Sequence, residues 1–92
     1  MNTRRFDAGW RDGWEQMFNK MFGERYFVPG ETEHEDYLLG FAGGQEAAIW
    51  WDRGYKDGLK GRRTSAPEAF LHEYLTGHRV GLDDLRNTRM VA

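Results

Sequence analysis

The chain of 92 residues contains no cysteine, which excludes disulfide bonds, thiolate zinc sites and cysteine nucleophiles. Its one serine, Ser65, has no histidine nearby in the sequence that could activate it as a nucleophile. No apolar run approaches the roughly 18 residues of a membrane span, and the N-terminus carries charges where a signal peptide is apolar. We therefore expect a cytoplasmic protein that has no membrane segment and is not an enzyme.

Metal ligands are also few. The three histidines, His34, His72 and His78, form no His-x-x-x-His pair or equivalent ligand spacing. His78 occupies a position in an aromatic pattern, described next, where a packed neutral imidazole is the expected state. We predict no metal and no cofactor.

Glycine and aromatic residues are abundant and are arranged together. The pattern aromatic-x-x-Gly-aromatic-x-x-Gly occurs at 6–13, 37–44, 51–58 and 74–81, with His78 as the second ring of the last copy. On a helix these positions share one face, so each copy is a stripe of two rings and two glycines. A glycine costs a helix about 1 kcal/mol relative to alanine, so the stripes predict close helix contacts that recover this cost. The eight glycines concerned are Gly9, Gly13, Gly40, Gly44, Gly54, Gly58, Gly77 and Gly81.

Two breaks divide the chain into helices. Apolar periodicity predicts a first helix over about 3–22, followed by a loop that contains Pro29. A capping box at Thr32 predicts the start of a second helix, which could continue to about Lys60 and bend at Gly43-Gly44.

The second break is the segment 61–65. A capping box at Ser65, with Pro67 in the first turn, predicts a third helix over about 66–86. The tail 87–92 has no periodicity, and we expect it to fray.

The two halves of the chain look like a duplication, because each contains the same four features in the same order. These are a stripe, a loop with one proline, a capping box and a second stripe. We therefore predict an all-α protein, a compact bundle of three to four helices built from two related helical hairpins. The predicted organisation is one domain over 1–92, with the first hairpin at 3–46 and the second at 47–87.

Charge is uneven along the chain. Residues 1–46 hold five Lys/Arg against nine Asp/Glu, whereas residues 47–92 hold eight against six. The charged segments can be solvated helix ends and faces. Alternatively, the basic segment is a docking surface for phosphate or for an acidic protein; its residues are Arg53, Lys56, Lys60, Arg62 and Arg63.

The sequence Arg-Gly-Tyr-Lys-Asp-Gly-Leu-Lys-Gly-Arg at 53–62, then Pro67, then Tyr-Leu-Thr-Gly-His-Arg at 74–79, resembles the bacterial proteins related to ribosome modulation factor. The segment 29–41 of the first half is similar to a variant of the same pattern. The resemblance implies a helical hairpin per unit and a regulator that binds the ribosome through rRNA. The residues that contact phosphate would come from the second unit, and Trp50 would stack on a base. The phosphate-binding residues would be Arg53, Lys56, Lys60, Arg62, Arg63 and Arg79.

A protein-binding module is the competing hypothesis. A small acidic and aromatic domain without catalytic residues also suits a phage or mobile-element inhibitor that blocks a host protein complex, as anti-CRISPR proteins do. Tryptophan is enriched at interface hot spots, so Trp50 and Trp14 are the candidate anchors, although tryptophan at helical spacing is more often core. Trp50 and the adjacent Trp51 differ by about 100° around a helix and cannot easily share one buried stripe. A homodimer is a further possibility.

Overall fold

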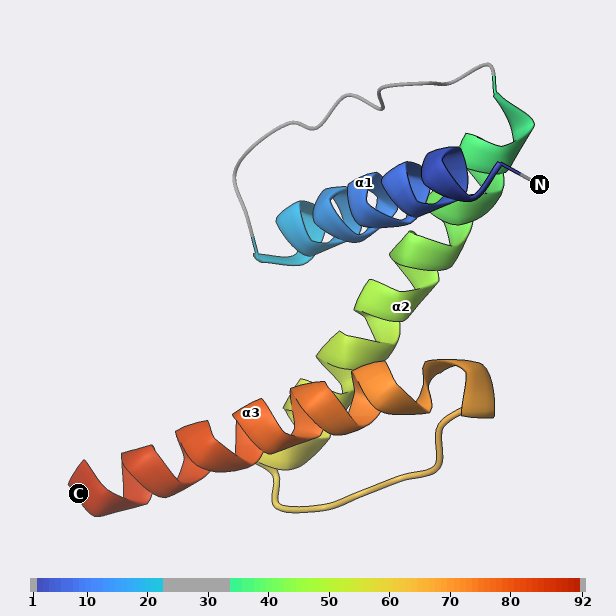
Figure 1. Cartoon of the computed structure of the whole chain (residues 1–92). Coiled ribbons are helices and arrows are strands. Elements are labelled where there is room, and N and C mark those ends of the chain that lie inside the picture. The colour runs from blue at the N-terminus through green and yellow to red at the C-terminus, as the bar shows by residue number, and fades with distance from the viewer. Residues whose placement is uncertain (1, 23–33, 92) are drawn as a thin grey trace. The chain divides into compact units, whose positions relative to one another are not determined.

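The computed structural model describes residues 2–22 and 34–91, and all regular structure within these ranges is helical (Figure 1). The elements in chain order are α1 (Thr3–Phe22), α2 (Glu35–Leu59), the short 3₁₀ helix η1 (Glu68–Phe70) and α3 (Leu71–Val91). The predicted all-α class is confirmed, with three α-helices in the part described.

Contacts between Cα atoms group the chain into two compact units, Met1–Ile49 (unit 1) and Trp50–Ala92 (unit 2). Unit 1 pairs α1 with the first part of α2, and unit 2 pairs the last part of α2 with α3. That the whole chain forms one domain stays a prediction.

The first two helices begin and run largely as the sequence predicts. The side chain of Asn2 caps α1, because its Oδ1 accepts a hydrogen bond from the backbone N–H of Arg5 at 3.1 Å. Glu35 and Asp36 lie in the first turn of α2, where negative charge is favourable to the helix dipole. The predicted cap Thr32 lies outside the described residues. Through Gly43 and Gly44, α2 is one continuous helix.

The third helix differs from its prediction at both ends. Pro67, and not Ser65, is the N-cap of η1, and no side chain caps this end by a hydrogen bond. The chain first makes a 3₁₀ turn, with Phe70 N–H donating to the Pro67 carbonyl at 3.0 Å, and then continues as α3. At the other end α3 extends to Val91, beyond the predicted end at Arg86, and the hydroxyl of Thr88 donates to the carbonyl of Asp84 one turn earlier at 2.9 Å.

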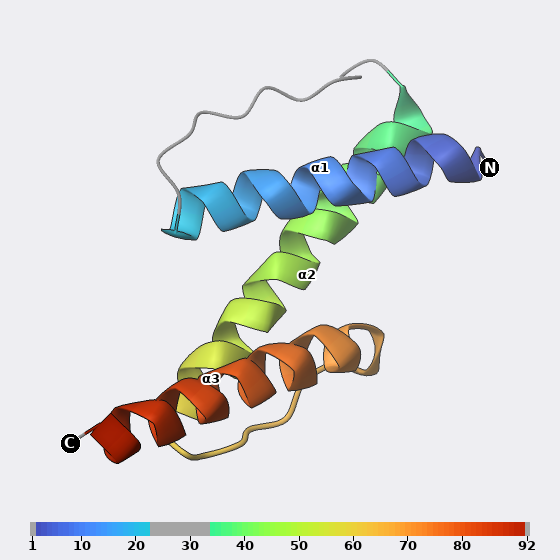
Figure 2. The same cartoon turned by 60° about the vertical axis from the view of Figure 1, so that its left-hand side comes forward.

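The helices of each unit run in the same direction, so the predicted hairpins, which are antiparallel, are wrong. In unit 2, Gly54 lies against Tyr74, whereas Gly58, one turn later in α2, lies against His78, one turn later in α3. In unit 1, Gly40 and Gly44 of α2 likewise meet progressively later residues of α1. Figure 2 shows α1 crossing the first part of α2. Twelve residues separate α1 from α2 and eight separate α2 from η1, more than the two to five of a helical hairpin.

Glycine backbone contacts hold each helix pair together, as the stripes predict. The eight stripe glycines are buried, and a Cβ added to any of them would overlap the backbone of the partner helix. At Gly9 and Gly54, for example, it would collide with the carbonyl oxygen of Tyr37 and Tyr74 respectively. The α-hydrogen that occupies this direction in glycine points at the carbonyl, which is the geometry of a Cα–H···O contact.

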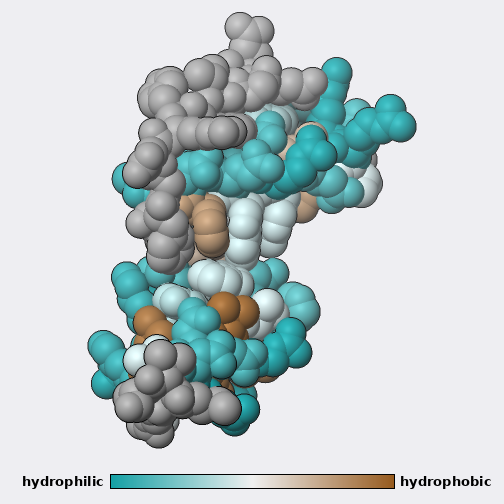
Figure 3. All heavy atoms as spheres, turned by 90° about the vertical axis from the view of Figure 1, so that its left-hand side faces the viewer, coloured by the Kyte–Doolittle hydropathy of each residue, from teal (hydrophilic) through white to brown (hydrophobic). Residues whose placement is uncertain are grey.

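The rings of the stripes pack in pairs one turn apart on each helix. Ring centroids are 6.1 Å apart for Phe6–Trp10, 6.0 Å for Tyr37–Phe41, 5.5 Å for Trp51–Tyr55 and 6.0 Å for Tyr74–His78. Of these eight side chains, Tyr37 and Tyr74 are fully buried and the others are half-buried. On the face drawn in Figure 3, apolar residues form small patches among polar ones.

Replacing a stripe glycine by alanine should therefore destabilise the protein. We expect Gly44→Ala to lower the free energy of unfolding by about 1–3 kcal/mol, because its Cβ would overlap the Trp10 carbonyl, despite the better helix propensity of alanine. The neighbouring Gly43→Ala is the matched control, because its Cβ would meet only the half-buried ring of Trp10, which can move. Urea unfolding followed by circular dichroism measures both; equal losses for the two variants would contradict the glycine–carbonyl contact.

Candidate functional site

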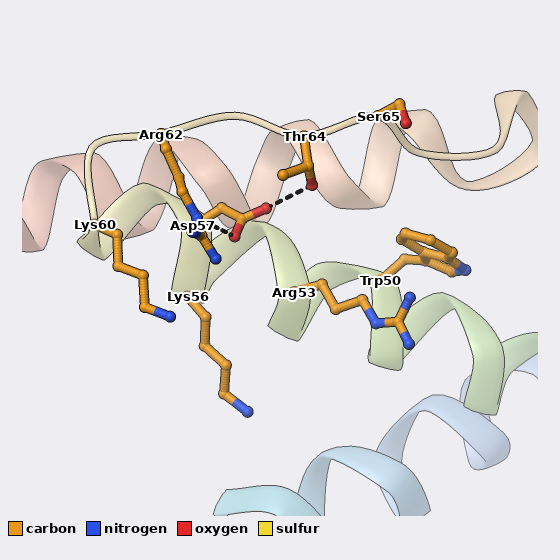
Figure 4. A pocket seen from close by; sticks show the side chains of 8 residues that line it. All are labelled: Trp50, Arg53, Lys56, Asp57, Lys60, Arg62, Thr64 and Ser65. Atoms are coloured by element: carbon orange, nitrogen blue, oxygen red, sulfur yellow. Dashed lines mark hydrogen bonds and ion pairs between the residues drawn. The ribbon is translucent and has the colours of Figure 1, made fainter.

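Unit 2 carries a surface groove of about 330 Å³ formed by the last part of α2 and the segment that follows it (Figure 4). We call it the cationic groove; its lining residues are Trp50, Arg53, Lys56, Asp57, Lys60, Arg62, Thr64 and Ser65. It brings together four of the six predicted phosphate-binding residues and the predicted stacking ring, Trp50.

Helical spacing explains why the α2 residues of the groove lie together. Trp50, Arg53 and Asp57 are three and four residues apart in turn, so they share one face of α2, with Lys56 at its margin. Lys60, directly after the end of α2, follows Asp57 by three residues. Figure 4 shows the side chains of Arg53, Lys56 and Lys60 extending on the same side of the chain. From Trp50 to Asp57 the helix rises about 10 Å.

A glycine turn brings the following segment back onto α2. Gly61 has a φ of 67°, the left-handed conformation that glycine adopts without strain. Gly61 N–H donates to the Gly58 carbonyl and Arg62 N–H to the Asp57 carbonyl, both at 3.0 Å, the two bonds of a Schellman motif. Such motifs commonly add an apolar contact between the two outer residues. Here an ion pair takes its place, between Arg62 Nε and Asp57 Oδ1 at 3.4 Å.

The carboxylate of Asp57 is the centre of the site. Its Oδ2 accepts hydrogen bonds from the Tyr74 hydroxyl at 2.6 Å and from the Thr64 hydroxyl at 2.8 Å. The Tyr74 oxygen in turn accepts the backbone N–H of Thr64 at 2.8 Å. Asp57 is 9% exposed and Tyr74 is fully buried, so a carboxylate removed from water is compensated by donors from α3 and from the segment after α2.

These bonds also set the ionisation of Asp57. The hydrogen bonds from Tyr74 and Thr64 lower the pKa of Asp57 below its usual value, and the Arg62 guanidinium lowers it further. Burial opposes them by raising this pKa, but it does not prevail. Asp57 is therefore ionised throughout the neutral range.

The other charges of the groove are less constrained. The Arg53 guanidinium carbon lies 4.6 Å from the centroid of the Trp50 ring, a cation–π contact. Lys56 Nζ pairs with the buried Asp52 at 2.9 Å, whereas Lys60 has no ion pair with any residue in 2–22 or 34–91. The four cations exceed the two carboxylates, and the groove is suited to an anion.

The remaining predicted site residues lie elsewhere. Arg63 is exposed but does not line the groove. Arg79 lies on α3, where it lines a separate depression with Leu75 and Thr76. Trp14 lies on α1 in unit 1 and is half-buried, with its backbone against Gly44.

The three residues of the hydrogen-bond network were not predicted as site residues from the sequence: Asp57, Thr64 and Tyr74. Nor was Ser65, which lines the groove. The aspartate has a counterpart in unit 1, where the Tyr37 hydroxyl donates to Asp12 at 2.6 Å. In both units the aspartate directly precedes the second glycine of a stripe. This recurrence is a signal that the sequence does contain.

His78 supports the groove from α3. Its ring stacks on Tyr74, and its Nε2 lies 2.6 Å from the Arg62 carbonyl oxygen. A carbonyl can only accept, so Nε2 carries the proton. The described residues contain no group of three or more His, Cys, Asp or Glu that could hold a metal ion. Nor is any helix in the described ranges long and apolar enough to cross a bilayer.

Stability should depend on pH through Asp57. The pKa of Asp57 is lower in the folded protein than in the unfolded chain, where an aspartate has a pKa of about 4. This difference stabilises the fold fully above the unfolded-state pKa, and the stabilisation is lost as the pH falls through the folded-state pKa. Urea unfolding between about pH 2 and pH 6 should show this loss in the wild type and a shallower dependence in Asp57→Asn. The exposed Asp83→Asn is the control and should follow the wild type. If Asp57→Asn shows the same pH dependence as the wild type, the hydrogen bonds of Asp57 contribute nothing to the pH dependence of stability.

Neither the family models, nor the curated proteins, nor the solved structures gave a match to this chain.

Proposed function

We propose that this protein is a small non-enzymatic regulator of the ribosome-modulation-factor type, which acts on translation by binding RNA on the ribosomal surface. The observation that carries the proposal is the cationic groove, in which Arg53, Lys56, Lys60 and Arg62 lie beside Trp50. The four cations belong to the segment 53–62, which resembles the family.

The composition of the groove fits a phosphate backbone. Lysine presents a point charge to phosphate and arginine a planar fork, and together such groups dominate the affinity of proteins for nucleic acid. An aromatic ring beside them can stack on an unpaired base. Asp57 reduces this positive charge but does not reverse it, because the groove lining holds four cations against this one carboxylate.

The acidic unit 1 is proposed to make no contact with the RNA. It holds five Lys/Arg against nine Asp/Glu, whereas unit 2 holds eight against six. Negative charge is repelled by phosphate, so unit 2 is the RNA-binding unit.

We also propose that the two units arose by duplication. Both use the same glycine–carbonyl contacts, and both join a tyrosine to the aspartate before a stripe glycine. The repeated element is then a pair of parallel helices.

Binding to ribosomes should be detected by sedimentation. We expect the tagged protein to migrate with ribosomal particles when a cell lysate is run through a sucrose gradient at low salt. Raising the salt should weaken co-migration, because binding to phosphate releases counterions. Migration at the top of the gradient at every salt concentration would contradict the proposal.

A matched pair of charge reversals tests the groove itself. Lys60→Glu with Arg62→Glu should abolish co-migration, because both residues line the groove. Arg4→Glu with Arg11→Glu changes the net charge equally but alters a different depression, on α1. This control should still migrate with ribosomes; equal loss in both would indicate an effect of net charge alone.

A second function, inhibition of a host protein complex by a phage or mobile-element protein, is favoured by one observation. Leu38 and Leu39 on α2 are 45% and 52% exposed, next to the exposed Glu35, and exposed adjacent leucines suit a protein interface. Trp50 would remain a candidate anchor. In the same gradient this function predicts that the protein migrates with a nuclease-resistant protein complex and that Leu39→Glu abolishes this co-migration.

Sedimentation equilibrium of the purified protein reports whether it forms a homodimer.

A further inference from the structure

Three hydrogen bonds hold Arg62 in the cationic groove, two through its main chain and one through its side chain. Its backbone N–H donates to the Asp57 carbonyl at 3.0 Å, and its own carbonyl accepts from His78 Nε2 at 2.6 Å. Its side chain donates to Asp57 Oδ1 through Nε at 3.4 Å. Both the main chain and the guanidinium of this residue are therefore positioned by its neighbours.

We infer that Arg62 is the oxyanion-recognising residue of the groove and that Asp57 is the positioning residue that orients its guanidinium. This inference rests on the proposed function, because it assigns the phosphate contact within the same groove. The class of ligand is a phosphate ester or another oxyanion that can accept two parallel hydrogen bonds.

The atom used by the ion pair is the basis of this assignment. Asp57 engages Nε, and neither Nη of Arg62 has a hydrogen bond to another residue in the described ranges. The two Nη groups remain as a planar pair of donors, the arrangement that binds phosphate oxygens bidentately. The side chain of Arg62 is 61% exposed, so a ligand can reach it.

Positioning lowers the cost of binding. A free arginine loses side-chain conformational entropy when it is fixed against a ligand, whereas Arg62 has already lost part of it in the unbound protein. Arg63 is the natural comparison. It has the same charge one residue later, is exposed, and has no hydrogen bond or ion pair with the rest of the described chain.

The charge of Asp57 and its positioning of Arg62 predict opposite effects of neutralising Asp57 on anion binding. If Asp57 only reduced the positive charge of the groove, its neutralisation would strengthen binding of an anion. If Asp57 orients Arg62, its neutralisation weakens binding. Asp57→Asn is suited to this comparison, because an amide oxygen can still accept from Tyr74 and Thr64.

The first experiment measures binding of a labelled RNA single strand of about eight nucleotides by fluorescence anisotropy. We expect Arg62→Ala to raise the Kd about tenfold or more, and Arg63→Ala to raise it only about twofold. Arg62→Lys, which keeps the charge but not the fork, should resemble Arg62→Ala more than the wild type. Equal effects of Arg62→Ala and Arg63→Ala would overturn the inference while leaving RNA binding established.

A double-mutant cycle tests the role of Asp57. We expect Asp57→Asn to weaken RNA binding in the wild type and to have no further effect when Arg62 is already alanine, since the two residues act as one unit. The same loss in both backgrounds would assign Asp57 a general structural role. Tighter binding by Asp57→Asn would show that only its charge matters.

A measurement without RNA separates the two proposals. In a ¹⁵N-resolved NMR spectrum, the Arg62 Nε–H resonance should be protected from exchange in the wild type and lose this protection in Asp57→Asn. Titration with inorganic pyrophosphate should shift the Arg62 resonance and leave that of Arg79 unchanged. If pyrophosphate shifts Arg62 but RNA does not bind, the proposed function fails and the inference stands. If neither ligand perturbs Arg62, the inference is wrong.

Discussion

The close approach of glycine α-carbons to carbonyl oxygens is the contact on which both units depend. Buried glycines of α1 and α2, and of α2 and α3, leave no room for a Cβ against the partner backbone. Each such contact contributes only about 0.5–1 kcal/mol, but several act together in each helix pair. They also bring the two backbones near enough for short polar side chains to bridge them.

The site of unit 2 follows from this closeness. Tyr74 begins one stripe and Asp57 precedes the last glycine of another, so contact between the stripes brings the hydroxyl within 2.6 Å of the carboxylate. The Gly61 turn then directs the next segment to the same carboxylate. The groove is formed where a helix pair, a helix end and a returning segment share one buried anion.

Sequence periodicity was sufficient to predict the all-α class, the extent of α1 and the close glycine contacts, because these depend on residues of one helix face. It could not give the direction of pairing, since a stripe at i, i+3, i+4 and i+7 looks the same to a parallel or an antiparallel partner. Four cations and Trp50 were found for the groove, because α2 places most of them on one face. Asp57 was missed, since its role depends on Thr64 and Tyr74, which reach it from outside α2.

Comparison of the units separates what supports the helix pair from what forms the groove. Unit 1 has the same tyrosine–aspartate bond, between Tyr37 and Asp12, and the guanidinium of the adjacent Arg11 lies 4.0 Å from this aspartate. In unit 2 the corresponding carboxylate also holds Thr64 and Arg62. The shared bond therefore belongs to the helix pair itself. The proposed capacity to bind an anion depends in unit 2 on the glycine turn at the end of α2 and on the basic segment that this turn brings back to Asp57.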